Sequence, residues 1–295
     1  MAEHISFFDA IEANKRNSLI FIAVMFFLFL AVIFAISYIF DIGICGPTLG
    51  FFALLFYSVV VYYQGDRVIL ALSGAKEARK EEYPFLYNVV EGLSLACQIP
   101  MPKLYIIDDP SPNAFATGRD PQHASVAVTT GLLSIMKREE LEGVIAHEMS
   151  HIANFDIRFS MIAIVFAGAI ALLGEFAWRS MRFGFGGGRR DRGGGILILI
   201  ALLFVILAPI FAQLVRLALS REREYLADAN GARLTRYPEG LASALEKIKI
   251  ASIPTKAAND TTASLYFSNP FPAKLGFITS THPPIDERIK KLRSM

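Results

Sequence analysis

The sequence predicts a mainly α-helical integral membrane protein with a small α+β domain outside the bilayer. Hydrophobic residues make up 54% of the 295 positions and charged residues only 19%, which is too apolar for two ordinary soluble domains. The apolar residues are also concentrated in four long runs, which predict about four transmembrane or membrane-embedded helices. About 170 residues remain outside these runs, enough for one folded core.

The first two apolar runs predict a membrane hairpin within residues 1–65. Residues 18–40 carry no charge, and as a helix they would span about 34 Å, enough to cross the hydrocarbon core. A second uncharged run follows at residues 46–64. Because Lys15 and Arg16 precede the first run, we expect a cytoplasmic N-terminus and a retained anchor in place of a cleaved leader.

Two further runs, residues 160–178 and 195–214, predict a second membrane hairpin within residues 160–219. The loop between them carries five arginines and a glycine-rich tract, a composition typical of disorder. A full crossing would place those arginines on the outer side, against the positive-inside tendency. A hairpin that only dips into the bilayer would remove the conflict, so both depths stay open.

The segments that flank the second hairpin, residues 66–159 and 220–295, are expected to fold together as one domain. An amphipathic pattern over residues 77–98 ends before two prolines and predicts a helix. Alternating apolar and β-branched residues predict strands at residues 103–108 and 125–130. The segment between these strands is rich in Pro, Asn and Gly and predicts a loop or a bent hairpin.

Residues 137–154 carry the pattern on which the functional interpretation depends. Acidic first turns and a recurring apolar face predict a helix. Within it, residues 147–151 form an HExxH pattern, whose two histidines lie about 40° apart around the axis and share one face. The imidazoles of His147 and His151 can bind a tetrahedral zinc ion. Glu148 can take a proton from the water that attacks a carbonyl carbon, so the pattern predicts peptide-bond hydrolysis.

A catalytic zinc needs a third protein ligand, for which the spacing leaves several candidates. These are His4, His123, His282 and the carboxylates. Residues 220–229 predict a charged helix directly after the second hairpin, where Glu224 and Asp228 lie four apart on one face. One could bind the metal and the other orient a ligand, since two passes or one dip return this helix to the surface that carries His151. An ordinary juxtamembrane charge cluster is the alternative explanation.

HExxH before a membrane hairpin, then Glu-x-x-x-Asp at Glu224 and Asp228, with two hydrophobic helices at the N-terminus, resembles the M48 family of integral-membrane zinc metallopeptidases. The resemblance covers nearly the whole chain. It implies a zincin-like metalloprotease domain in which one zinc ion is held by His147, His151 and Glu224. It also implies that Asp228 orients a ligating histidine.

Two other segments are similar to motifs of the family. Residues 113–118 match its NAFxxG motif, which implies that Asn113 and Ala114 line the groove and bind an extended substrate by strand addition. A match to its HPxxxxRI motif near the C-terminus implies that His282 and Arg288 lie near the oxyanion of the tetrahedral intermediate.

The resemblance implies an endopeptidase that cleaves misfolded or unassembled membrane proteins in bacterial quality control under stress. It would be a multi-pass protein of the inner membrane with a cytoplasmic catalytic domain. Membrane-protein substrates and the lipid bilayer are the expected partners, and a homo-oligomer is a further option. The 29 basic and 27 acidic residues nearly cancel, so nucleic acid is not expected as a partner.

Three other functions remain as alternatives. A non-enzymatic membrane adaptor or transporter subunit would keep its function when His147 is changed. A narrow-specificity zinc protease would process one defined peptide or lipopeptide. A protease that cuts within the membrane is disfavoured, because charged residues flank the HExxH helix on both sides and favour access of water.

Overall fold

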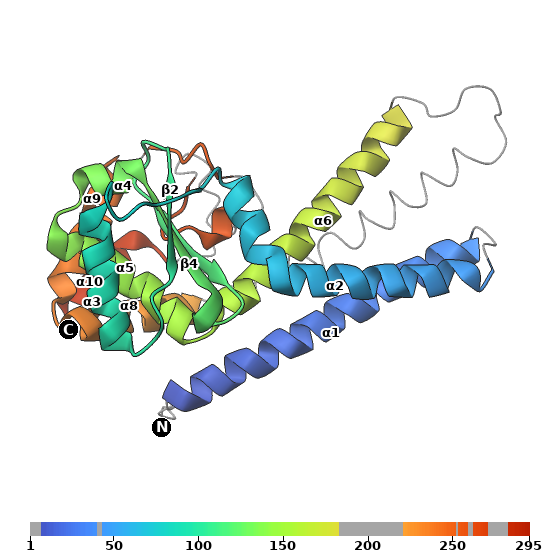
Figure 1. Ribbon diagram of the computed structural model, residues 1–295, viewed down its shortest axis with the longest axis horizontal. Coiled ribbons are helices and arrows are strands. Elements are labelled where there is room, and N and C mark those ends of the chain that lie inside the picture. The colour runs from blue at the N-terminus through green and yellow to red at the C-terminus, as the bar shows by residue number, and fades with distance from the viewer. Residues whose placement is uncertain (1–6, 40–42, 183–220, 252, 259–261, 271–282) are drawn as a thin grey trace.

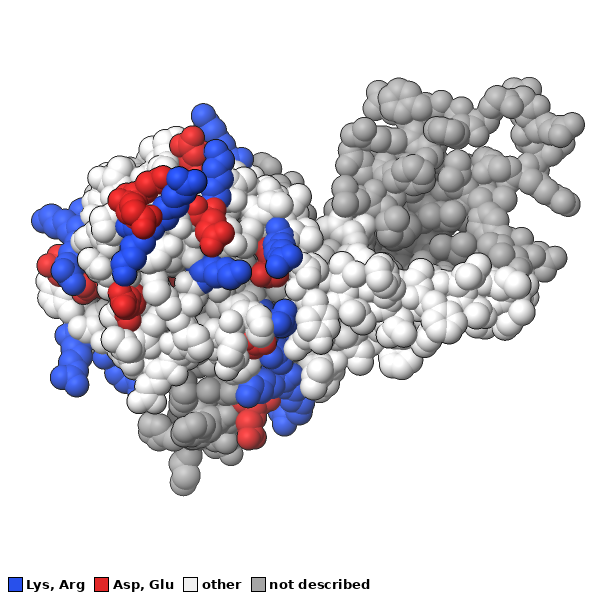
Figure 2. All heavy atoms as spheres, in the orientation of Figure 1, with Lys and Arg blue, Asp and Glu red and all other residues white. Residues whose placement is uncertain are grey.

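The computed structural model describes residues 7–39, 43–182, 221–251, 253–258, 262–270 and 283–295. A folded domain carries a small sheet with helices packed on it, and three long helices project from it (Figure 1). The projecting helices are α1 (Phe7–Ile39), α2 (Cys45–Leu72) and α6 (Asp156–Arg182). On the face shown in Figure 2, charged side chains gather over the folded domain and where the projecting helices join it, and the outer parts of these helices present uncharged atoms.

Helices α1 and α2 are long and apolar enough to cross a membrane, with candidate spans at Asn14–Phe34 and Cys45–Leu72. Large apolar side chains such as Phe27 and Phe56 are 66% and 72% exposed, as lipid-facing residues would be. Both helices are longer than the predicted runs at residues 18–40 and 46–64. The uncharged runs mark only the apolar part of each helix, and α2 continues past two charged residues to reach the folded domain, where Ile69 is buried.

Helix α6 contains the third predicted run and begins four residues before it, after a bend of 82° that separates it from the preceding helix α5 (Arg138–Ala153). The fourth run, residues 195–214, and most of the arginine-rich loop lie outside the described residues. The structure therefore supports two candidate spans in its described part, or three if the bent pair counts as one, and a total of four membrane helices stays a prediction.

Within the described residues, the sheet has four strands in the order β1-β2-β4-β3. The strands are β1 (Lys76–Glu77), β2 (Lys103–Ile107), β3 (Ala114–Gly118) and β4 (Ala124–Thr129). Strands β2 and β4 are parallel, and β3 pairs antiparallel with β4, with Ala114 opposite Val128. The predicted strands are present. Of the two predictions for the segment between them, the loop is wrong and the bent hairpin is closer, because β3 is the first strand of a hairpin with β4.

The remaining helices pack around α5 and the sheet. They are α3 (Pro84–Cys97), α4 (Thr130–Ile135), α8 (Arg221–Thr235), α9 (Pro238–Ala251) and α10 (Ile285–Arg293). The prediction that α3 begins near residue 77 is wrong, because residues 76–77 pair with β2 and the helix starts at Pro84, where the missing N–H costs nothing. Helix α8 contains residues 221–229 of the charged helix predicted at residues 220–229, and residue 220 lies outside the described residues.

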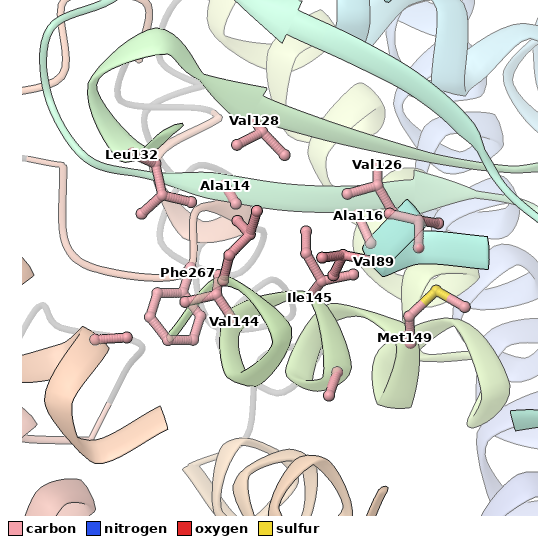
Figure 3. Close-up of a cluster of buried hydrophobic side chains, with 14 of the residues drawn as sticks. Val89, Ala114, Ala116, Val126, Val128, Leu132, Val144, Ile145, Met149 and Phe267 are labelled. Carbon is pink, nitrogen blue, oxygen red and sulfur yellow. The ribbon is translucent and has the colours of Figure 1, made fainter. Parts of the chain in front are cut away.

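Helix α5 lies across the sheet and supplies much of the core. Val144 and Ile145 are fully buried and point toward β3 and β4, where Ala114 and Val126 face them (Figure 3). On its other side α5 packs against α8 and α9. Because α5 is covered on both sides, His147 and Glu148 of its HExxH motif are buried, and His151 is half-buried.

Candidate active site

Three candidate metal ligands meet between α5 and α8. His147 and His151 project from α5, and Glu224 from the first turn of α8. The two Nε2 atoms lie 3.2 Å apart, and the Glu224 carboxylate lies 3.4 Å from Nε2 of His151 and 3.8 Å from Nε2 of His147. Ligand atoms about 2.1 Å from a tetrahedral zinc ion would be about 3.4 Å from one another, so the spacing fits zinc.

A close approach of α8 to α5 sets this spacing. A Cβ atom at Gly231 would lie 3.1 Å from the backbone nitrogen of His147, so glycine lets the two helices come together. The amide of Asn230 also donates a 3.2 Å hydrogen bond to Oγ of Ser150. Glu224 lies about two turns before Gly231 on the same face of α8 and is thereby held beside the histidines.

A carboxylate lies beside Nδ1 of each of the two candidate histidine ligands. Nδ1 of His147 lies 2.9 Å from Oδ1 of Asp228, and Nδ1 of His151 lies 3.0 Å from Oδ2 of Asp156. A carboxylate accepts a hydrogen bond, so each imidazole carries its proton on Nδ1 and directs the lone pair of Nε2 into the site. Two lone pairs and a carboxylate that face one another repel, and a cation between them removes that repulsion.

The pKa values of the two histidines are shifted in opposite directions. Burial lowers the pKa of His147 to about 4 and outweighs its hydrogen bond to Asp228, so this imidazole is neutral and able to bind a metal. Burial also opposes the charged form of His151, but hydrogen bonds and charges from Asp156 and Glu224 outweigh it and raise its pKa well above the ordinary value. The surroundings of His151 thus favour a positive charge at the place where the three ligands converge.

Glu148 is buried beside the two histidines. Burial raises its pKa to about 7, against the lowering effects of His151 and of a hydrogen bond from the backbone N–H of Ala116. A carboxylate with a pKa near neutral can accept a proton from water and release it again. That hydrogen bond aligns Glu148 with strand β3.

Arg288 lies behind His147, fully buried. Its guanidinium donates to Asp228 at 2.9 and 2.7 Å and to the carbonyl of Phe267 at 3.1 Å. The ring of Phe267 packs edge to face against His147, with 4.9 Å between centroids. These contacts make Arg288 part of the framework that orients His147, and its predicted contact with an oxyanion stays a prediction. His282 lies outside the described residues.

Asn113 directly precedes edge strand β3 and Ala114 begins it, and both residues are buried. The side-chain amide of Asn113 pairs with both backbone groups of Ser268, at 3.1 Å each. The carbonyl of Ala114 accepts a 2.8 Å hydrogen bond from the N–H of Phe267. A segment of the chain itself therefore pairs with the outer edge of β3 at these two positions, where the sequence predicted contact with substrate.

Sequence reasoning missed Asp156 and Phe267 as parts of this site. Asp156 is one of the charged residues that flank the HExxH helix, and a carboxylate within a turn or two of a ligating histidine is a recognisable signal. Phe267 had no such signal, because its contact with His147 joins positions that are 120 residues apart. The described site thus contains three candidate ligands, a carboxylate partner for each histidine, and a buried carboxylate that could act as a base.

Comparison with known proteins gives a consistent result. The model of Peptidase family M48 matches residues 80–295. A "Protease HtpX homolog" from Dictyoglomus turgidum is 52% identical over 291 residues, which cover 98% of this chain and 95% of that protein. A "Protease HtpX homolog" from Streptococcus gordonii is 45% identical over 298 residues, covering 98% and 99%. The resemblance to the M48 family that the sequence motifs indicated is confirmed.

One solved structure, "Crystal Structure of S. mikatae Ste24p", is similar over 92% of this chain and 62% of its own, with 19% identity and a TM-score of 0.49.

Proposed function

Because this chain belongs to peptidase family M48, we propose that it is a zinc-dependent endopeptidase anchored in the membrane, with its active site at the cytoplasmic face. The observation that carries the proposal is the convergence of two imidazole lone pairs and one carboxylate within 4.8 Å of one another. A neutral His147 and the position of Glu224 between α5 and α8 fit a catalytic zinc site with three protein ligands.

The proposed reaction is hydrolysis of a peptide bond. Zinc, when bound, would polarise the scissile carbonyl and make a water molecule more acidic. Glu148 takes the proton from the attacking water and delivers it to the amine that leaves. Asp228 and Asp156 hold the two imidazoles in the tautomer that the reaction needs. His282 is proposed to stabilise the oxyanion, directly or with Arg288.

The substrate is proposed to bind as an extended strand along β3. β3 is an edge strand of the described sheet. Every second residue along it directs its backbone N–H and carbonyl away from β4. The outward carbonyl of Ala114 accepts a hydrogen bond from the N–H of Phe267, and the outward N–H of Ala116 donates one to the carboxylate of Glu148. A substrate strand would therefore run past Ala116 toward Gly118, with Asn113 and Ala114 at the border of the groove.

The position of the basic residues supports a cytoplasmic domain. Lys15 and Arg16 lie in the part of α1 that contacts the folded domain, and basic residues favour the cytoplasmic side. The exposed Cys45, at the start of α2, would then lie outside. We propose misfolded or unassembled membrane proteins of a bacterial inner membrane as substrates, because two candidate spans hold the site near the bilayer surface.

The orientation can be tested on intact cells with a maleimide that cannot cross membranes. Cys45 should be labelled from outside. A cysteine introduced at Lys80, which is exposed on the folded domain, should be labelled only after the membrane is made permeable, in a background where Cys45 and Cys97 are both replaced. Labelling of residue 80 in intact cells would contradict a cytoplasmic active site.

The activity can be tested with protein purified in detergent. Wild type should contain one zinc per chain and should cleave casein and an unfolded membrane protein. Glu148→Gln should keep its zinc and lose cleavage by 100-fold or more, since a general base contributes roughly 10²- to 10⁴-fold. Glu139→Gln, on an exposed position of the same helix, is the matched control. Cleavage of one defined peptide only would favour a narrow processing enzyme, and unaltered cleavage by Glu148→Gln would exclude Glu148 as the base.

A further inference from the structure

A side chain of the first membrane helix reaches the turn that follows the HExxH helix. Nδ2 of Asn14 donates two hydrogen bonds, at 2.9 Å to the carbonyl of Asn154 and at 2.8 Å to Oδ1 of Asp156. Asn14 is only 9% exposed although it lies at the start of a candidate span. Asn154 ends α5 and Asp156 begins α6, so one amide group holds both ends of the 82° bend.

The same carboxylate that accepts from Asn14 also orients a metal ligand. Oδ1 of Asp156 is the acceptor for Asn14, and Oδ2 lies 3.0 Å from Nδ1 of His151. A chain of hydrogen bonds therefore runs from α1 through Asp156 to the imidazole whose Nε2 faces the site. Because a carboxylate is rigid and planar, fixing one of its oxygens restricts where the other can lie.

Other contacts keep this part of α1 in place. Phe21 packs edge to face against Phe159 of α6, with 4.9 Å between ring centroids. The ammonium of Lys15 lies 4.3 Å from the ring centroid of Phe155, in the bend itself. Ser18, one turn after Asn14, is fully buried. The contact between Asn14 and Asp156 is therefore part of a packed interface between α1 and the start of α6.

We propose that Asn14 is a positioning residue for the metal centre, which makes the orientation of His151 depend on the docking of α1 against the catalytic domain. The inference rests on the proposed zinc site. The site would reach its full metal affinity only when the first membrane helix is seated against the bend. The chain would thus be a weak metal binder until its membrane part is assembled.

The size of the effect follows from the neighbours of Asp156. Arg223 of α8 also approaches Oδ1 of Asp156, at 3.7 Å, so this oxygen keeps one basic neighbour when Asn14 is removed. Loss of Asn14 should therefore weaken zinc binding about 3- to 10-fold. Loss of Asp156, the direct partner of His151, should cost more, about 10- to 100-fold.

The test measures zinc affinity of the full-length, metal-free protein in detergent by competition with a chromophoric chelator. The variants are Asn14→Leu, Asn14→Asp and Asp156→Asn, with Asn17→Leu, half-buried on the same helix, as the control. Asn14→Leu and Asn14→Asp should weaken zinc binding, the second because it places two carboxylates together. Asn17→Leu should bind zinc as the wild type does, and melting of the metal-free proteins identifies any variant that fails to fold.

A double variant separates positioning from general stability. If Asn14 acts through Asp156, Asn14→Leu should have little further effect on zinc affinity once Asp156→Asn is present. Equal zinc affinity in Asn14→Leu and wild type, or losses that multiply in the double variant, would overturn the inference and leave the proposed protease standing. A wild-type protein that binds no zinc would overturn both.

Discussion

Arg288 and Asp228 form a buried, two-pronged ion pair directly behind the first candidate metal ligand. Nε and Nη2 of the arginine donate to the two carboxylate oxygens at 2.9 and 2.7 Å, and Oδ1 of Asp228 also lies 2.9 Å from Nδ1 of His147. Burial raises the pKa of Asp228, but the charge of Arg288 and the hydrogen bonds outweigh it and lower the pKa to about 2. Asp228 is therefore held ionised to orient His147.

Arg288→Ala should reduce both stability and zinc affinity. Removal of Arg288 leaves the buried charge of Asp228 uncompensated, which should lower the free energy of unfolding by about 3–5 kcal/mol. Without Arg288, Asp228 would no longer be fixed beside His147, so zinc affinity should fall about tenfold or more. The melting temperature of the metal-free protein measures the change in stability, and competition with a chelator measures the change in zinc affinity. Arg293→Ala on the same helix is the control, because its ion pairs are exposed and contribute little to stability. If Arg288 acts only on the oxyanion, kcat will fall while zinc affinity stays unchanged.

Glu148→Gln should make the metal-free protein more stable at alkaline pH. Burial raises the pKa of Glu148 from 4.5 to about 7 in the folded state, so the fold holds a proton that the unfolded chain has released. The free energy of unfolding should therefore fall as the pH rises from about 4.5 to 7, by about 3 kcal/mol in total. Glutamine removes this dependence. Melting temperatures of the two metal-free proteins should agree at pH 4.5 and separate at pH 8, and a constant difference would contradict the assignment.

Glu224→Gln should weaken zinc binding more than Glu222→Gln. An amide oxygen is a neutral and poorer zinc ligand than a carboxylate, so the first change should cost at least tenfold in affinity. Glu222 lies on an exposed position two residues earlier and serves as the matched control. The measurement is zinc content after dialysis against a graded series of chelator concentrations. Equal zinc retention by the two variants would show that the third ligand lies elsewhere.

Two of the candidate metal ligands could be predicted from the sequence because helix geometry alone brings His147 and His151 onto one face. Helix geometry alone did not identify the third candidate ligand, since residue spacing left Glu224 as one of several possibilities. Only the resemblance to a family selected it, and the packing of α8 on α5 then brought it within 3.4 Å of His151. Local periodicity predicts a helix face, but it does not predict which distant helix will cover that face.

Asp156 shows why the rest of the site could not be predicted. The residue comes five positions after His151, and a straight helix would carry it away from the imidazole. The chain instead bends by 82° at Phe155, a non-glycine residue with a φ of 61°. Such a conformation is uncommon and has no sequence signal here. The contact with Asn14 depends on the same bend and on the docking of a helix 140 residues earlier in the chain.

The sequence did not distinguish strand β3 from a loop, for a different reason. Most of its residues are small, and they lie next to Pro, Asn and Gly, which are typical of loops. Pairing with β4 and burial under α5 make the segment a strand, and both of these are tertiary effects.

Gly143→Ala should destabilise the catalytic domain, although alanine is the better helix former. A Cβ atom at Gly143, on α5, would lie 2.7 Å from the backbone nitrogen of Leu241 and 2.8 Å from its Cα, so α9 would have to move away. Overpacking of this kind costs about 1–3 kcal/mol. Gly92→Ala on α3 is the matched control, because nothing lies within 4 Å of its Cβ position and the same change there should add about 0.5–1 kcal/mol. The melting temperatures of the two variants should therefore shift in opposite directions. A gain in stability from Gly143→Ala would show that α5 and α9 are not in close contact.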